Sequence, residues 1–168
     1  MLQFLFSIPF LGLLVVIQSA VISQMRLLNG VADLMLLVLA ALAVQDNVRN
    51  AWLWALVGGL IATLASALPF GVLLGSYLAV SGLALLLKRW FNKAPLLALL
   101  IVVFTGTLIV QGTSFLAVVL LQGGSLPLGQ VINLITLPSL LLNLLLCLPL
   151  FLIVRDMAAW LYPRELEV

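Results

Sequence analysis

The sequence predicts an all-α integral membrane protein folded as a six-transmembrane-helix bundle. Of its 168 residues, 65% are hydrophobic and only 7% are charged, whereas about 25% of the residues in soluble domains are charged. So few charges cannot cover a water-facing surface, and most of the surface must therefore face hydrocarbon. The apolar residues form long unbroken runs rather than short alternating segments, which favours helices over a β-barrel.

Charged and turn-forming residues divide the apolar runs into separate spans. Pro69 and Gly71 divide the uncharged run 51–87, and the glycine-rich segment 123–129 divides the uncharged run 94–154. The predicted spans are approximately residues 3–22, 31–44, 51–68, 70–87, 95–121 and 131–154, in one transmembrane domain (1–154) followed by a short cytoplasmic tail (155–168). The second span is short, which leaves a five-span alternative in which that segment is re-entrant or interfacial.

The distribution of Lys and Arg predicts the orientation. With the N-terminus in the cytoplasm, most basic residues fall on the cytoplasmic side, as the positive-inside rule requires. These are Arg49, Lys88, Arg89, Lys93, Arg155 and Arg164, while Arg26 falls on the outer side. The tryptophans Trp52, Trp54, Trp90 and Trp160 all fall at the same predicted cytoplasmic edge, where indole rings favour the headgroup region. We therefore expect a multi-pass protein of the plasma membrane with both termini in the cytoplasm.

The sequence offers no residues for a catalytic, cofactor-binding or metal site. It has no histidine, a single cysteine (Cys147) and five scattered acids, so the usual general base and the commonest metal ligands are missing. It contains no glycine-rich phosphate-binding loop followed by Lys-Ser or Lys-Thr. Cytoplasmic loops account for the slight basic excess, and no nucleic-acid partner is expected. We therefore expect a protein that is not an enzyme and that contacts lipids and other membrane proteins.

Asp33 is the only acid close to a predicted span. We place it about one turn into the second span, near the outer surface. An acid there can cap a helix N-terminus, remain in contact with headgroups and be neutralised by Arg26 across the first outer turn. The alternative is a binding role, because ionisable groups within a membrane are commonly functional.

Two surfaces are candidates for contacts with a partner. Small residues at four-residue spacing occur in the third span (Gly58, Ala62, Ser66) and in the fourth (Gly71, Gly75, Ala79). Such stripes let helices approach closely, either within the chain or against a foreign transmembrane helix. The second surface is a polar face on the last span, formed by Asn133, Thr136, Ser139, Asn143 and Cys147. Its amide Asn143 either bonds a neighbouring helix or helps to line a cavity or partner surface. Pro138 and Pro149 free backbone carbonyls near that face.

Three segments resemble the rod shape-determining protein MreD family of bacterial inner-membrane proteins, and their order covers most of the chain. Residues 32–37 are similar to the Pro-Asp-Leu-Leu motif of that family, with Ala32 in place of proline. Residues 59–71 resemble a family segment with Gly-Leu, Asp, Leu, Ser, Gly and Leu-Pro-Leu-Gly, but Thr63 stands where an aspartate is usual. Residues 137–143 resemble the proline and asparagine pattern that precedes the basic C-terminus of the family.

The resemblance implies a part in the cell-wall elongation machinery of rod-shaped bacteria. Members of that family associate with the bitopic protein MreC, and through it with the MreB filament, the glycan polymerase RodA and its penicillin-binding transpeptidase. The family is also similar in fold to the six-helix substrate-binding subunits of energy-coupling factor transporters. The sequence thus leaves two main readings: a membrane scaffold and a small-molecule-binding transporter subunit. We favour the scaffold, because the predicted outer loops are short and poor in polar groups. A structural subunit of an unrelated membrane complex is the third reading.

Overall fold

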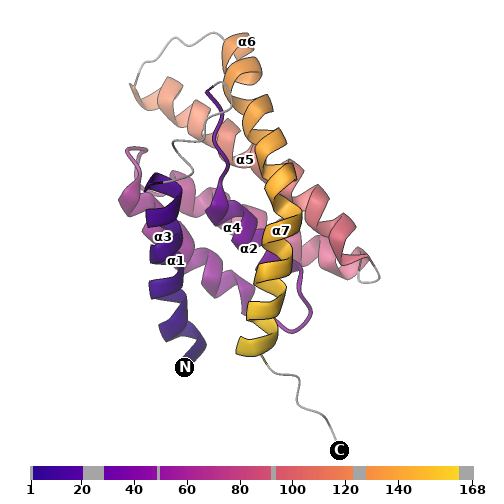
Figure 1. The fold of residues 1–168 in the computed structure, drawn as a ribbon. Helices are drawn as coiled ribbons and strands as arrows, with labels where there is room; N and C mark the ends of the chain where they lie inside the picture. Colours follow the sequence, from indigo (N-terminus) through magenta and orange to yellow (C-terminus); the bar gives the residue numbers. More distant parts are fainter. Residues whose placement is uncertain (1, 21–28, 49, 92–93, 123–127, 163–168) are drawn as a thin grey trace, which may run out of the picture.

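The computed structural model describes residues 2–20, 29–48, 50–91, 94–122 and 128–162, and their regular structure is helical (Figure 1). In chain order the helices are α1 (Leu2–Ala20), α2 (Leu34–Val44), α3 (Ala51–Ala65), α4 (Val72–Trp90), α5 (Pro95–Gln122), α6 (Leu128–Val131), the π-helical turn η2 (Ile132–Thr136) and α7 (Leu137–Leu161). The all-helical prediction is therefore confirmed for the described part of the chain.

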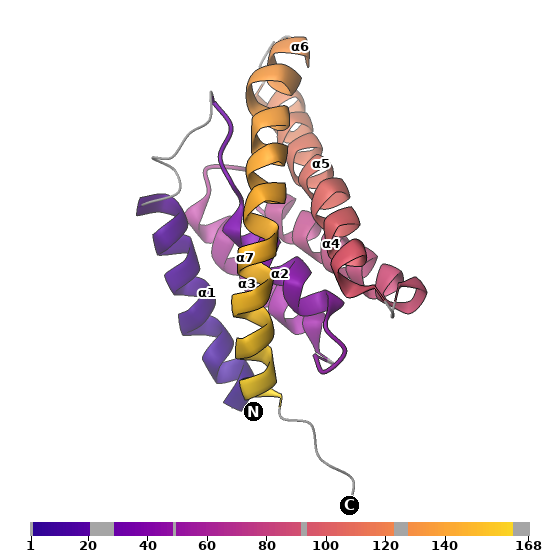
Figure 2. The ribbon, with the colours of Figure 1, turned by 45° about the vertical axis from the view of Figure 1, so that its right-hand side comes forward.

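Three of these helices are long and apolar enough to cross a membrane. They are α4, α5 and the continuous segment Leu128–Leu161, which joins α6, η2 and α7. Figure 2 shows that last segment as one column beside α5. Even α4, with 19 residues, is about 29 Å long at about 1.5 Å per residue, which matches a hydrocarbon core about 30 Å thick. The described part of the fold therefore contains helices of suitable length and composition to cross a membrane.

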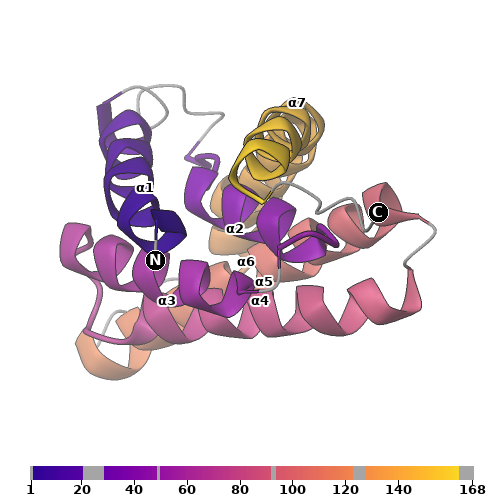
Figure 3. The same ribbon diagram turned by 90° about the horizontal axis from the view of Figure 1, so that it is seen from below.

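Helix α2 lies at the centre of the molecule. All of its 11 residues are buried, and it packs against α7, α4, α5, α3 and α1. Figure 3 shows it enclosed between α1, α7 and the α4–α5 pair. A helix that is apolar on every side belongs inside a protein or in lipid, and α2 lies inside. At about 16 Å it is roughly half as long as the hydrocarbon core is thick. The other residues of the predicted span, 31–33, are not helical.

Helix ends differ from the predicted spans where charge was taken as a boundary. The fourth span was expected to end at residue 87 and the sixth at residue 154, yet α4 continues to Trp90 and α7 to Leu161. Helix α7 thus extends seven residues beyond the predicted end of the sixth span, into the predicted tail. Charged residues such as Arg155 and Asp156 are ordinary helix residues, and both side chains are exposed, so a helix that reaches water need not end at them.

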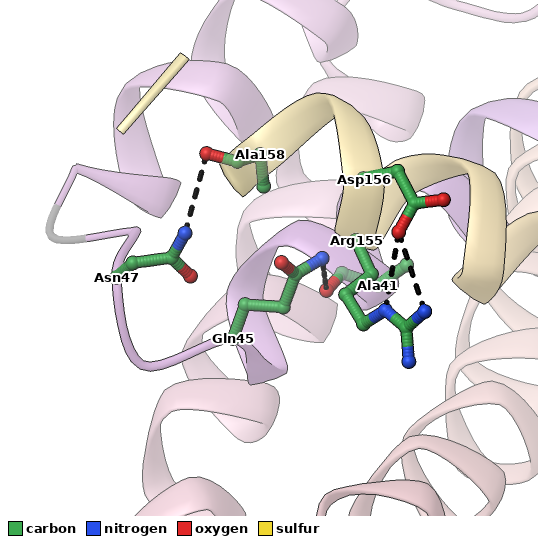
Figure 4. Close-up of polar contacts among 6 residues, drawn as sticks. All are labelled: Ala41, Gln45, Asn47, Arg155, Asp156 and Ala158. Carbon is green, nitrogen blue, oxygen red and sulfur yellow. Dashed lines mark hydrogen bonds and ion pairs between the residues drawn. The ribbon is translucent and has the colours of Figure 1, made fainter. Parts of the chain in front are cut away.

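One end of the molecule gathers the start of α1, residues 45–48 and the last turns of α4 and α7. Asn47 donates from Nδ2 to the carbonyl of Ala158 at 3.2 Å (Figure 4). Lys88 at the end of α4 donates to the carbonyl of Gln45 and lies 3.8 Å from the Asp46 carboxylate. These contacts fasten the α2–α3 connection to the ends of the two long helices. The start of α1 and the end of α7 lie at this same end (Figure 1).

The tryptophans at this end do not share one environment. Trp52, Trp90 and Trp160 are exposed, whereas Trp54 is buried. The Trp54 indole donates to the Tyr162 hydroxyl at 3.0 Å and packs edge-on against Phe10. Placing Trp54 in the headgroup region was therefore wrong. It is two residues from Trp52, and on a helix that spacing turns one ring outward and the other inward.

Candidate functional site

A buried polar layer forms where the extended residues before α2 run along α7. The Asn29 amide donates to the Leu134 carbonyl at 3.1 Å, and the Val31 amide donates to Ser139 Oγ, also at 3.1 Å. The Asp33 amide donates to Asn143 Oδ1 at 2.8 Å. Extended backbone within a membrane protein needs such partners, because hydrocarbon offers none. The polar face predicted on the last span thus serves to hold this segment.

Pro138 lies four residues beyond one of those partners. Proline has no backbone N–H and cannot bond the carbonyl four residues earlier, that of Leu134, which accepts the Asn29 amide. Leu134 lies in the π-helical turn, where a helical donor would come from five residues further on. That Pro138 itself frees this carbonyl stays a prediction.

Asn133 does not belong to the polar face. Ser139, Asn143 and Cys147 are buried at 1%, 1% and 2% exposure, whereas Asn133 is exposed. Asn133 itself belongs to the π-helical turn Ile132–Thr136, which ends before Ser139. A π turn inserts about one extra residue per turn, so the regular spacing of 3 and 4 residues does not carry across it. The prediction of one continuous face from Asn133 to Cys147 is wrong for this reason.

Gly30 is a structurally important residue that we did not single out from the sequence. A Cβ at this position would lie 2.6 Å from the Ser139 backbone N, 2.7 Å from Pro138 Cβ and 2.9 Å from the Ile135 carbonyl oxygen. Only glycine allows so close an approach of two backbones. The glycine after Asn29 was the available signal, but its contact with α7 could not be inferred locally.

Asp33 is the N-cap of α2 rather than a residue one turn inside it. One carboxylate oxygen, Oδ1, accepts the Leu36 amide at 3.0 Å, which confirms the capping interpretation. The Tyr77 hydroxyl reaches both carboxylate oxygens, at 3.1 and 2.9 Å. The Met35 amide donates to Gln18 Oε1 at 3.3 Å, so α1 also helps to cap α2. Arg26 lies outside the described residues.

Asn143 joins three parts of the chain. Its Oδ1 accepts the Asp33 amide, and its Nδ2 donates to Thr107 Oγ1 at 2.9 Å. Thr107 in turn donates to the Val103 carbonyl at 2.7 Å. With both ends of the amide bonded within the chain and 1% exposure, this side chain acts as internal glue and presents no surface to a partner.

Thr63, which stands where the resembling family has an aspartate, is buried at 6% exposure on α3. Within the described ranges its hydroxyl has no hydrogen-bond partner. Burying a neutral hydroxyl without a hydrogen-bond partner costs far less free energy than burying an unpaired carboxylate.

The small-residue stripes have three different environments. Gly58 and Gly59 pack against Met35 and Leu74, inside the chain. Gly71 precedes α4 with a φ of +93°, a left-handed conformation that favours glycine. It is therefore a cap and not part of a helical groove, which corrects the predicted stripe of Gly71, Gly75 and Ala79. A Cβ at Gly75 would meet nothing within 4 Å.

Gly75 and Ala79 instead line an exposed hollow of about 400 Å³ between α4 and α5. Its lining residues are Val72, Gly75, Ser76, Ala79, Ile109, Thr113, Leu116, Ala117 and Leu120; we call this the α4–α5 groove. The Ser76 and Thr113 hydroxyls bond each other at 2.7 Å and also bond carbonyls of their own helices. The groove thus presents an apolar surface whose polar groups are already satisfied.

A second hollow, of about 450 Å³, lies beside Asp33 at the end of the molecule opposite the start of α1. Its lining residues are Val15, Gln18, Ser19, Val31, Asp33, Met35, Ala62, Ala65, Ser66, Leu73 and Tyr77; we call this the Asp33 pocket. From the short outer loops of the sequence we expected few polar groups for a ligand pocket. The polar groups come from helix ends instead, which loop length does not reveal.

The fold and these sites define a helical membrane protein with a polar layer inside and two hollows at its surface. In the described part of the chain, no three His, Cys, Asp or Glu side chains lie close enough together to hold a metal ion. Comparisons with protein families, characterised proteins and solved structures find no match to this chain.

Proposed function

We propose that this protein is a non-catalytic membrane scaffold of the bacterial cell-wall elongation machinery, and that it holds a bitopic MreC-like partner in the plasma membrane. Through that partner it would act with MreB, RodA and the penicillin-binding transpeptidase. The resemblance to the MreD family suggests these partners, and the α4–α5 groove is the observation that carries the proposal. Asn143 and its neighbours are internal, so the groove is the better of the two surfaces considered from the sequence.

The groove fits a single transmembrane helix. In lipid, helices associate through close packing at small residues rather than through a hydrophobic drive. Gly75 and Ala79 supply small exposed positions on α4, and the buried Ala117 adds a small residue to the lining on α5. Stable contacts between soluble surfaces bury about 1,200 Å² or more, and the connections between the described helices are too short to provide that area. The contact surface therefore lies within the bilayer.

Replacing Gly75 with leucine tests this function. We expect loss of co-purification of the bitopic partner and rounded cells, with normal amounts of the protein in the membrane. A Cβ at this position meets nothing within 4 Å, so we expect the leucine side chain to extend into the groove without disturbing the fold. Partner co-purification from native membranes and cell shape are the measurements.

Gly12→Leu is the matched control, because an added Cβ on α1 also meets nothing within 4 Å and α1 does not line the groove. This variant keeps its partner and the rod shape. Partner retention by Gly75→Leu would exclude the groove, and failure of the unaltered protein to retain any bitopic partner would exclude the scaffold.

We propose six membrane crossings with both termini in the cytoplasm. Support comes from the gathering of the start of α1, the end of α7, Lys88 and Arg155 at one end of the molecule. In a Cys147→Ala background, Ser125→Cys is expected to react with an impermeant thiol reagent added to intact cells, whereas Asn92→Cys is not. The reverse labelling pattern would refute this orientation.

A small-molecule-binding subunit of an energy-coupling factor type transporter is the second candidate function. The Asp33 pocket favours it, since such a subunit needs a hollow with converging polar groups. Co-purification of nucleotide-hydrolysing subunits instead of a bitopic partner would select this function over the scaffold.

A further inference from the structure

We propose that the Asp33 pocket binds a small organic amine, with its ammonium group at the Asp33 carboxylate and its apolar body between α1, α3 and α4. This inference goes beyond the scaffold function and does not depend on it. The pocket is formed by α1, the extended residues before α2, the end of α3 and the start of α4. None of these lining residues belongs to the α4–α5 groove.

The carboxylate of Asp33 can accept a further hydrogen bond from a ligand in the pocket. A carboxylate offers about four lone-pair sites. Oδ1 accepts the Leu36 amide, and the one Tyr77 hydroxyl proton is shared between Oδ1 and Oδ2. Oδ2 therefore has room for a further donor. The residue is partly exposed, although it lies between helices, and the hollow lies directly beside it.

The charge of the lining selects the ligand class. Among the described residues that line it, Asp33 is the only charged one, and Gln18, Ser19, Ser66 and Tyr77 are the neutral polar members. A cationic donor would gain a charge-assisted hydrogen bond in a region of low dielectric constant, whereas an anion would meet repulsion. The Gln18 amide oxygen is already held by the Met35 amide, which fixes this wall of the pocket.

The apolar part of the lining favours a ligand with a hydrocarbon body. Val15, Val31, Met35 and Leu73 form much of the wall. The volume of about 450 Å³ falls within the range of about 300–1,000 Å³ typical of small-molecule sites. A primary amine of this kind has two natural sources, a soluble metabolite or the headgroup of an aminophospholipid.

Calorimetric titration of the purified full-length chain with phenethylamine and with phenethyl alcohol tests the proposal. The chain is placed in phosphatidylglycerol nanodiscs, and protein-free nanodiscs serve as the blank. We expect saturable binding of the amine at least about tenfold tighter than binding of the alcohol, which has the same shape without the charge. Equal affinities, or no saturable binding of the amine up to millimolar concentration, would overturn the proposal.

Two variants separate the site from the fold. Asp33→Asn keeps a good helix N-cap and is expected to bind amine and alcohol equally. Ala65→Phe fills the pocket from an exposed position and is expected to lose both ligands. Gly75→Leu is the control and keeps the preference for the amine, so failure of the scaffold and failure of this site give different results. If both pocket variants keep the preference as well, the site is refuted.

Nanodiscs that also contain phosphatidylethanolamine distinguish the two sources. Weaker apparent binding of phenethylamine in those discs supports a lipid headgroup as the natural occupant. Unchanged binding supports a soluble amine.

Discussion

Gly30→Ala is expected to destabilise the folded protein severely, by about 3 kcal/mol or more. The new methyl group would lie 2.6 Å from the Ser139 backbone N and 2.9 Å from the Ile135 carbonyl oxygen. Both are helix backbone atoms, which cannot move aside as the end of a flexible side chain can. Moving the extended segment instead would break its bonds to α7 and leave buried amides without partners. Thermal unfolding of the purified protein in detergent measures the effect.

The same substitution at Gly82 is the control for this prediction. A Cβ there meets nothing within 4 Å, and alanine is the better helix former by about 1 kcal/mol. Gly82→Ala is therefore expected to unfold at the same temperature as the unaltered protein or higher. If Gly30→Ala and Gly82→Ala unfold alike, the close approach of the two backbones does not govern stability.

Asn143→Leu is expected to cost about 2–4 kcal/mol in stability. Hydrogen bonds between membrane helices are worth only about 0.6 kcal/mol on average, because each partner finds another in the unfolded state. For Asn143 we expect a larger loss of stability than this average, because the Asp33 amide and the Thr107 hydroxyl both bond this one side chain. Leucine would leave the Asp33 amide without an acceptor, at about 1–3 kcal/mol for each unsatisfied group.

Asn133→Leu on the same helical segment makes the matched comparison. Its side chain is exposed, so the change is expected to leave the unfolding temperature nearly unaltered. Denaturant titration of both variants in detergent gives the difference directly. Similar losses in the two variants would contradict the internal role of Asn143 and the displacement caused by the π turn.

The positions of the helices followed from simple signals in the sequence. Charges and the Pro69–Gly71 and 123–129 breaks separated apolar runs, and a helix lies within each of those runs. The limits of α4 and α7 could not be read in the same way, because Arg155 and Asp156 are exposed and compatible with a helix. Charge marks where a chain meets water, not where its helix ends.

The polar layer was only half predictable. The sequence showed that Ser139 and Asn143 share a face that must point away from lipid, and both are buried. It could not show their partners, because the bonded amides of Val31 and Asp33 are 108 and 110 residues away along the chain. Nor could it show the π turn Ile132–Thr136, because the spacing argument assumes an unbroken α-helix.

Small residues illustrate the same limit from another side. Gly58 and Gly75 each belong to a predicted stripe of small residues, yet one packs against Met35 and the other faces open space. Spacing specifies which residues share a helix face. Spacing does not specify whether that face contacts another helix. Gly58 does so because α2 lies at the centre of the molecule.

The central position of α2 also determines the order in which this protein can be assembled. Its leading residues depend on Leu134, Ser139 and Asn143, all in the final stretch of the chain. A ribosome that has not yet synthesised those residues leaves the amides of residues 29, 31 and 33 without their acceptors, and hydrocarbon cannot replace them. The residues that lead into α2 are therefore translated early, but they gain their hydrogen-bond partners only after α7 has been made. Folding of this protein is thus completed at its centre.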